Sequence, residues 1–136
     1  MDRKQPEIKE KADMKVLHYG SKSDYQMIED MIHHLPSAVK ECRDLLQCDD
    51  YEDFVSTLTQ VRYNVVIVTM NHARGMEGVI AARTHCPNLP VVWFSDDDGF
   101  GLQSYRLGCT YFGVLPITAE KMERAIERCE LQLRVS

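Results

Sequence analysis

The chain has 136 residues, with 44% hydrophobic and 27% charged residues, which is the profile of one ordinary globular domain that buries its own core. Its formal net charge of −5 argues against a nucleic-acid surface, because phosphate binding needs clustered lysine and arginine. No apolar run approaches the roughly 20 residues of a membrane helix and no signal peptide is visible, so we expect a cytoplasmic protein without membrane contact.

The five cysteines are odd in number, and each lies in an apolar-patterned segment and not in a CxxC pair. Buried cysteines of this kind are usually reduced. We therefore expect reduced core or half-buried cysteines, no metal site and no cofactor, with a zinc site or a redox pair of cysteines as the alternative.

The first third of the chain begins with a charged stretch, residues 1–13, which we expect to be a flexible leader because it holds too few apolar residues to offset the cost of ordering. The domain would then span residues 14–136. A short apolar strand over 15–19 comes next. Ser23 and Gln26 form a capping-box pattern before a helix that ends at a proline, Pro36.

A second strand is expected over residues 38–46, although its apolar residues do not alternate cleanly. Asp49 or Asp50 can cap the following helix. The apolar residues of that helix recur at helical spacing, at Phe54, Leu58 and Val61.

An unbroken apolar run, Val65 to Val68, predicts a strand that is buried on both faces, as in a parallel sheet. In an open α/β sheet, the residues past the carboxyl end of such a strand face the crevice where ligands bind. A helix is expected from about Met76 to His85. The residues at the tip of the strand are Thr69, Met70, Asn71 and His72.

The second half of the chain continues this alternation, with a strand over 91–95, an acidic loop over 96–98, a helix over 102–107 and a strand over 111–115. A last helix begins near residue 119. The boundaries are marked by Gly108, Pro116 and Thr118. Strand and helix thus alternate throughout, which predicts an α/β fold: a doubly wound, five-stranded parallel sheet with helices on both faces.

Several segments are similar to those of one family. Gly75-Met76-Glu77-Gly78 follows the central strand, the strand at 91–95 ends in a small hydroxyl, Ser95, and Leu115-Pro116 ends the last strand. From Lys15 to about Leu133 the chain resembles the receiver domain of bacterial response regulators. The run FGLQSYRLGCTYFGVLPITAEKMERAIERC is most similar to receivers that precede LytTR-type DNA-binding domains. The resemblance implies the strand order 2-1-3-4-5 and a cis peptide bond before Pro116.

Receivers accept a phosphoryl group from a sensor histidine kinase on an aspartate, assisted by Mg²⁺. The resemblance puts the two metal-binding acids at Gly20 and Ser21, the acceptor at Met70, the hydroxyl at Ser95 and the lysine at Leu115. Only Ser95 fits, because Mg²⁺ needs anionic oxygen ligands and phosphoryl transfer needs a nucleophile with cations beside it. The resemblance therefore implies a degenerate pseudo-receiver that is not an enzyme and binds no metal.

Other residues near the expected carboxyl edge of the sheet have two interpretations. The acids of the 96–98 loop are solvated caps or a displaced acceptor or metal site, and Asp24 complements a helix dipole or binds a metal. His72 is a surface residue or an acceptor of a proton or phosphoryl group. Phe112 is a core residue or, by resemblance, an aromatic switch.

The favoured function is a non-catalytic module of two-component signalling, which binds a protein partner or a second copy of itself. The expected surface comprises the fourth helix, fifth strand and fifth helix, with Gln103, Arg106, Tyr111, Phe112, Glu123, Arg124 and Glu127. One alternative is a phosphorelay regulator that is phosphorylated at a non-standard residue. Another is a small-molecule sensor with a crevice at Met70 and Leu115, although no glycine-rich phosphate loop supports it.

Overall fold

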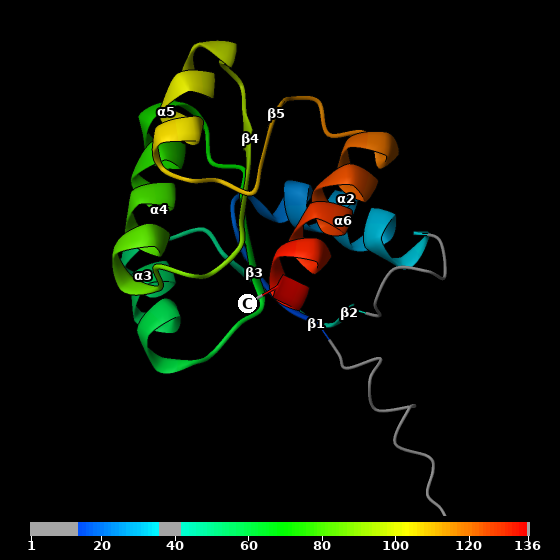
Figure 1. Ribbon diagram of the computed structural model, residues 1–136, viewed down its shortest axis with the longest axis horizontal. Coiled ribbons are helices and arrows are strands. Elements are labelled where there is room, and N and C mark those ends of the chain that lie inside the picture. Colours follow the sequence, from blue (N-terminus) through cyan, green and yellow to red (C-terminus); the bar gives the residue numbers. More distant parts are fainter. Residues whose placement is uncertain (1–13, 36–41, 136) are drawn as a thin grey trace, which may run out of the picture.

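The structure, a computed structural model, describes residues 14–35 and 42–135 (Figure 1). The expected leader and the expected end of the first helix at Pro36 lie outside these residues. The elements are β1 Met14–Tyr19, α2 Lys22–His33, β2 Cys42–Cys48, α3 Tyr51–Gln60, β3 Val65–Val68, α4 His72–His85, β4 Val91–Ser95, the 3₁₀ helix η1 Asp98–Phe100, α5 Gly101–Arg106, β5 Tyr111–Val114 and α6 Ala119–Val135.

The strands form one sheet in the order β2-β1-β3-β4-β5, and every neighbouring pair is parallel, which confirms the predicted fold class and strand order. Helices α2 and α6 cover one face of the sheet, and α3, α4 and α5 cover the other (Figure 1). Because parallel strands need crossover connections, this arrangement follows from the alternation of strands and helices in the sequence.

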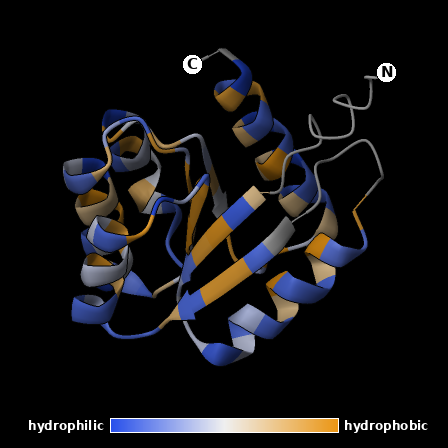
Figure 2. Cartoon of the chain, turned by 90° about the horizontal axis from the view of Figure 1, so that it is seen from below, coloured by the Kyte–Doolittle hydropathy of each residue, from blue (hydrophilic) through white to orange (hydrophobic). Residues whose placement is uncertain are grey.

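Each face of the sheet supports its own hydrophobic core. Val16, Ile67 and Phe94 lie in the core under α2 and α6, whereas Leu17 and Val68 lie in the core under α3 and α4. Side chains alternate between the faces along a strand, so the continuous apolar run of β3 supplies both cores. Figure 2 shows hydrophobic residues gathered along the strands and polar residues interleaved along the helices.

Several boundaries differ from the predicted ones because local hydrogen bonds were not visible in the sequence pattern. Ser21 and not Ser23 is the N-cap of α2, and it accepts a hydrogen bond from the Asp24 amide at 3.1 Å. The second strand is Cys42–Cys48 and is shifted toward the carboxyl end of the expected segment. Helix α4 begins at His72, about one turn before the predicted start at Met76.

Other predicted boundaries are confirmed. Asp50 caps α3 through the Asp53 amide at 3.0 Å, and Thr118 accepts from the amide of Lys121 at 3.2 Å. Gly108 ends α5 with a φ of +69°, the left-handed conformation that favours glycine. The bond between Leu115 and Pro116 is cis, as the resemblance implied.

The structure also describes cysteine side chains and the length and polarity of the helices. The cysteines whose side chains the structure describes, Cys48, Cys86, Cys109 and Cys129, form no disulfide, and burial raises the pKa of the Cys129 thiol to about 12. Within the described ranges, every helix is too short or too polar to cross a membrane.

Candidate functional site

The positions that correspond to the phosphorylation pocket of a receiver all lie at the carboxyl edge of the sheet, as the sequence predicted. Gly20 follows β1, Met70 follows β3, Ser95 ends β4 and Leu115 follows β5. They do not form an acidic pocket. Met70 is only 8% exposed and packs in the core under α3 and α4, and Leu115 packs against the core on the opposite face of the sheet.

A buried polar linkage occupies the space beside Gly20. His18 of β1 is fully buried, and its Nε2 lies 2.8 Å from Oγ1 of Thr69, the residue just past β3. The same Oγ1 donates to Oδ2 of Asp24 in α2, also at 2.8 Å. Hydrogen bonds between side chains therefore tie the ends of two neighbouring strands to helix α2 beside Gly20.

The direction of these hydrogen bonds fixes the tautomer of His18. A carboxylate oxygen only accepts, so the single hydroxyl proton of Thr69 goes to Asp24. Thr69 Oγ1 must then accept from His18, which places the ring proton on Nε2. The other ring nitrogen, Nδ1, is buried and has no partner among the described residues. Burial without a compensating partner lowers the pKa of His18 from 6.5 to about 4, so the ring is neutral near pH 7.

The linkage leaves no room for a side chain at Gly20. A Cβ atom added there would overlap Thr69 Oγ1 and lie 2.5 Å from His18 Nε2. The Gly20 backbone is fixed as well, because its amide donates to the Cys48 carbonyl at 3.0 Å and its carbonyl accepts from Gln47 Nε2 at 2.8 Å. An aspartate at position 20, as in a working receiver, is therefore incompatible with this packing.

Helix α4 packs tightly over Met70, the residue at the position of the acceptor. Gly75 of α4 lies so close to the end of β3 that a Cβ atom there would be 2.5 Å from the Met70 carbonyl oxygen and 3.0 Å from Trp93 Nε1. Trp93 in turn packs against the rings of Phe100 and Phe112, each with a centroid separation of 5.4 Å. Helix α4 begins at His72, soon after β3 ends at Val68. Its first turns therefore lie over Met70, where an open loop would leave this position accessible.

Ser95 has a local structural role. Its side chain is 1% exposed, and Oγ accepts a hydrogen bond from the Asp97 amide at 3.0 Å. Ser95 therefore caps the loop that follows β4. Its carbonyl accepts from the Leu115 amide at 2.8 Å, which holds the ends of β4 and β5 together.

A lysine reaches this edge from a different position than the sequence comparison suggested. Lys121 of α6 donates from Nζ to the carbonyls of Val114 and Pro116, at 2.5 and 3.1 Å. These carbonyls flank Leu115, where a receiver has its lysine. The ammonium group is thus held by neutral backbone oxygens on the α6 side of the sheet.

His72 and Asp96 form a second polar pair at the same edge. Oδ1 of Asp96 accepts from the His72 amide at 3.0 Å, and Oδ2 lies 2.9 Å from His72 Nδ1. The backbone hydrogen bond from His72 is the main cause that lowers the pKa of Asp96. His72 has a φ of +57°, which is unfavourable for a residue with a Cβ and is held here by both contacts. His72 is 80% exposed, so it is a surface residue as expected, and its partner Asp96 was not visible in the sequence.

The remaining acids of the 96–98 loop do not converge. Asp97 caps η1 through the Gly99 amide at 2.8 Å, and Asp98 is exposed within η1. In the described part of the chain, no group of three or more histidine, cysteine, aspartate or glutamate side chains is arranged to hold a metal ion.

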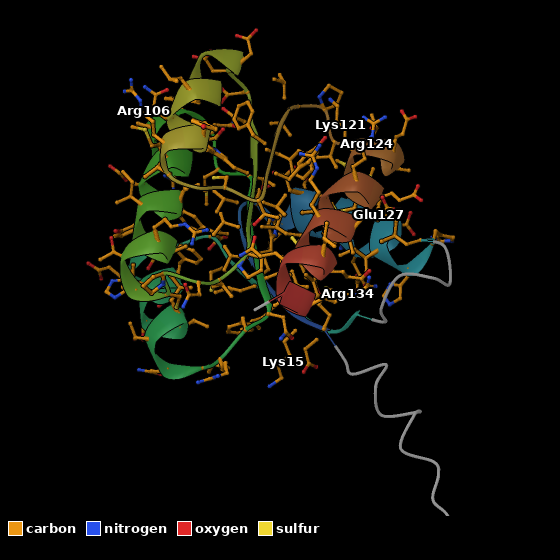
Figure 3. The ribbon with its side chains drawn as sticks, in the orientation of Figure 1. Lys15, Arg106, Lys121, Arg124, Glu127 and Arg134 are labelled. Carbon is orange, nitrogen blue, oxygen red and sulfur yellow. The ribbon has the colours of Figure 1, made fainter. Side chains whose placement is uncertain are left out.

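The expected interaction surface is not continuous. Tyr111 is wrongly placed there, because it is 8% exposed and packs in the core with the Arg128 guanidinium 5.3 Å from its ring centroid. Phe112 is half-buried against Trp93, and Glu123 and Gln103 are also half-buried. Arg106 projects from α5, whereas Arg124 and Glu127 lie on α6, and Figure 3 shows Arg106 and Arg124 on opposite sides of the molecule.

Grooves in the surface lie away from the degenerate pocket. One of about 400 Å³ is lined by Tyr25, Ile32 and Leu46 among others, and another of about 640 Å³ is lined by residues that include Arg62 and Pro90. Neither is lined by Met70 or Leu115, so neither corresponds to the crevice expected for a small-molecule sensor.

Comparison with known proteins shows which solved structures share this fold. No protein-family model matches the sequence, and no curated protein is similar enough to be a relative. Solved structures match closely in shape. A CheY-like receiver domain protein from Methanospirillum hungatei JF-1 has a TM-score of 0.73 at 10% identity, covering 92% of this chain and all (100%) of that one.

Two further receivers agree. A receiver domain protein from Clostridium thermocellum has a TM-score of 0.73 at 16% identity, with coverage of 90% of this chain and 98% of the other. The receiver domain of the Francisella response regulator 1452 has a TM-score of 0.68 at 18% identity, with coverage of 91% and 100%. Likeness at such low identity concerns the fold and not the activity. The chain therefore has the fold of the CheY-like receiver domains of response regulators.

Proposed function

We propose that this chain is a non-catalytic signalling module, a pseudo-receiver that acts by binding protein and is not phosphorylated on an aspartate. The observation that carries the proposal is the linkage of His18, Thr69 and Asp24, which fills the space beside Gly20. A phosphoryl acceptor site needs anionic oxygens for Mg²⁺ and a nucleophile, whereas this space holds a neutral imidazole and a hydroxyl, and the one carboxylate of the linkage, Asp24, accepts from that hydroxyl.

Binding is the function that such a scaffold retains, because a fold carries activity only through its sites. The similarity of residues 100–129 to receivers of LytTR-type regulators supports a role in bacterial two-component signalling. With a net charge of −5, the chain is suited to contact protein and not nucleic acid.

A second candidate function is a phosphoryl acceptor that uses His72. The Asp96 carboxylate lies 2.9 Å from Nδ1 of His72 and accepts a hydrogen bond from the N–H group there. The lone pair of His72 then lies on Nε2, and the His72 side chain is 80% exposed. In that reaction an acyl phosphate would lose its P–O bond as a P–N bond forms at Nε2, and the carboxylate would leave.

One experiment tests both candidates. The chain is incubated with acetyl phosphate and Mg²⁺, beside a receiver with an intact aspartate pocket, and the intact mass is measured at neutral pH. We expect no phosphoryl adduct on this chain, because Met70, at the position of the acceptor, is no nucleophile.

The matched variant His72→Gln separates the contrary outcomes. An adduct on the wild type that is absent from His72→Gln would support the phosphoryl acceptor function and contradict the pseudo-receiver. An adduct that persists in the variant would lie on another residue, and peptide mapping that placed it on an aspartate would contradict both candidates.

A further inference from the structure

A groove of about 640 Å³ lies at the amino edge of the sheet, the edge opposite to the degenerate pocket. Its lining residues are the end of α3 with its connection to β3 (58–64), the connection between α4 and β4 (86–90) and Leu133 of α6. These segments meet because the helices of an α/β sheet end at the edge where its parallel strands begin. We call this hollow the amino-edge groove.

Apolar side chains line much of the amino-edge groove. Tyr63 and Leu89 are half-buried against the core under α3 and α4, and Leu133 packs against the core on the opposite face of the sheet. Val61 is 43% exposed. Val61 and Tyr63 also line the groove of about 400 Å³, so the two hollows adjoin. Together they form an elongated depression, which suits an extended segment of protein chain better than a compact ligand.

Hydrogen bonds hold the walls of the groove in place. The Arg83 guanidinium donates to the carbonyl of Pro87 and, at 2.9 Å, to that of Leu89, which fixes the connection before β4. On the other side, the Lys15 amide donates to Oδ1 of Asn64 at 2.7 Å, and the Asn64 amide donates to the Lys15 carbonyl at 2.9 Å. A preformed groove loses little conformational entropy when it is occupied, which favours binding.

The charge at this groove is opposite in sign to that of the whole chain. Arg62 is the only charged residue among those that line the amino-edge groove, and Lys15 and Arg134 lie at the same edge, where β1 begins and α6 ends. Figure 3 shows Lys15 and Arg134 in the lower half of the domain. All three cations are exposed, and none has an ion-pair partner among the described residues. Two acids, Glu29 and Asp44, line the adjoining groove. In a chain with a net charge of −5, the amino-edge groove therefore favours an acidic ligand.

We propose that the amino-edge groove binds an extended segment of a partner protein in which acidic side chains flank an apolar one. The apolar side chain would lie against Val61, Tyr63 and Leu133, and a carboxylate would pair with Arg62. The inference rests on the proposed function, since it names the surface and the chemistry of the partner for a module that acts by binding. Nucleic acid is also anionic, but the apolar lining and the net charge of −5 favour protein.

The chemistry of the partner is tested by selection from a random-peptide library displayed on phage, with the full 136-residue chain as the immobilised target. We expect the selected peptides to be enriched, relative to the unselected library, in aspartate and glutamate next to leucine, isoleucine or phenylalanine. Selection of basic or uncharged peptides would overturn the proposal, and so would a selection that enriches no sequence.

The location is tested with the most enriched peptide, whose dissociation constant is measured by fluorescence anisotropy against matched variants. Arg62→Glu should weaken binding by roughly tenfold or more, because it replaces an attraction to the peptide carboxylate by a repulsion. Arg124→Glu changes an equally unpaired, exposed arginine on α6 and should leave the dissociation constant unchanged. Equal effects of the two substitutions would show only a dependence on net charge and would overturn the assignment to this groove.

The apolar contribution has its own matched pair. Val61→Ser should weaken binding by roughly fivefold, because the apolar area that the peptide covers is lost. Ile80→Ser on α4 changes a side chain of the same exposure, 43%, outside the groove and should have no effect. An unchanged dissociation constant for Val61→Ser would contradict the predicted apolar contact, and single-stranded DNA that displaces the peptide at physiological salt would overturn the choice of protein as partner.

These outcomes are separate from the phosphorylation test. A chain that selects no acidic peptide and takes up no phosphoryl group would overturn the amino-edge groove as a binding site and leave the proposed function intact. A chain that binds acidic peptides through Arg62 and is phosphorylated on an aspartate would do the reverse.

Discussion

Gly20→Ala should lower the free energy of unfolding by about 3 to 5 kcal/mol, as the sum of an overpacked core and a displaced buried hydrogen bond. The new methyl group would overlap Thr69 Oγ1 and crowd His18 Nε2, so either the linkage or the backbone between β1 and α2 must move. Urea denaturation at pH 7 measures the loss.

Gly101→Ala is the matched control. A Cβ atom there meets only the ring of Phe112, at an ordinary distance of 3.8 Å, and Gly101 is already helical, with a φ of −57°. This variant should be neutral or stabilising by up to about 1 kcal/mol. A loss of less than about 1 kcal/mol for Gly20→Ala would mean that the linkage yields easily and could make room for an acid.

Acid should destabilise the protein through His18. Its pKa is about 4 in the folded protein against 6.5 for an unperturbed histidine, so between these values the unfolded chain binds a proton that the native state does not. Stability should therefore be complete above pH 6.5 and fall by about 3 kcal/mol as the pH drops to 4, at 1.36 kcal/mol per unit of pKa difference. Urea melts from pH 4 to pH 7 follow this change.

His18→Gln removes the titrating group and keeps a side-chain N–H that can donate to Thr69, so its stability should depend less on pH than that of the wild type. His33→Gln is the control, because His33 is exposed at the end of α2. Equal pH dependence of the wild type and His18→Gln would show that the ring is already paired or hydrated in the native state.

Hydrophobic periodicity was sufficient to predict the doubly wound α/β sheet, whereas the strand order was implied by the family resemblance. The apolar run from Val65 to Val68 and the regular alternation with amphipathic segments dictate a parallel sheet covered on both faces, because backbone groups and apolar side chains can be satisfied together only in that arrangement. Boundaries were less predictable. Ser21 and Ser23 can both cap a helix, and only the tertiary position of the chain after β1 selects Ser21.

That the position matched to the acceptor lacks a nucleophile was predictable from a single residue, since Met70 cannot act as one whatever its surroundings. What surrounds that position was not predictable. His18 lies in a short apolar strand and has the pattern of an ordinary core residue. Thr69 is 51 residues away in sequence, and Asp24, although only six residues further on, belongs to the following helix. A histidine within a buried strand was the available signal, because a buried polar group needs a partner.

The pairing of His72 with Asp96 was hidden for the same reason. Each belongs to a loop that follows a different strand, and β3 and β4 are neighbours only in the folded sheet. The same holds for the interaction surface: sequence spacing placed Tyr111 with Arg106, but the alternation of side chains along β5 turns Tyr111 into the core under α6.

The most direct test of the account is a titration of the ¹⁵N-labelled chain with Mg²⁺ and then with beryllium fluoride, which mimics a phosphoryl group on a carboxylate, followed through the amide signals of Gly20, Met70 and Ser95. Because the one carboxylate of the linkage at this edge, Asp24, accepts from Thr69 and the acceptor position holds a buried thioether, we predict no saturable shift of these signals. Saturable shifts at all of these amides, at ligand concentrations that affect a working receiver, would contradict the claim that the pocket has lost its chemistry.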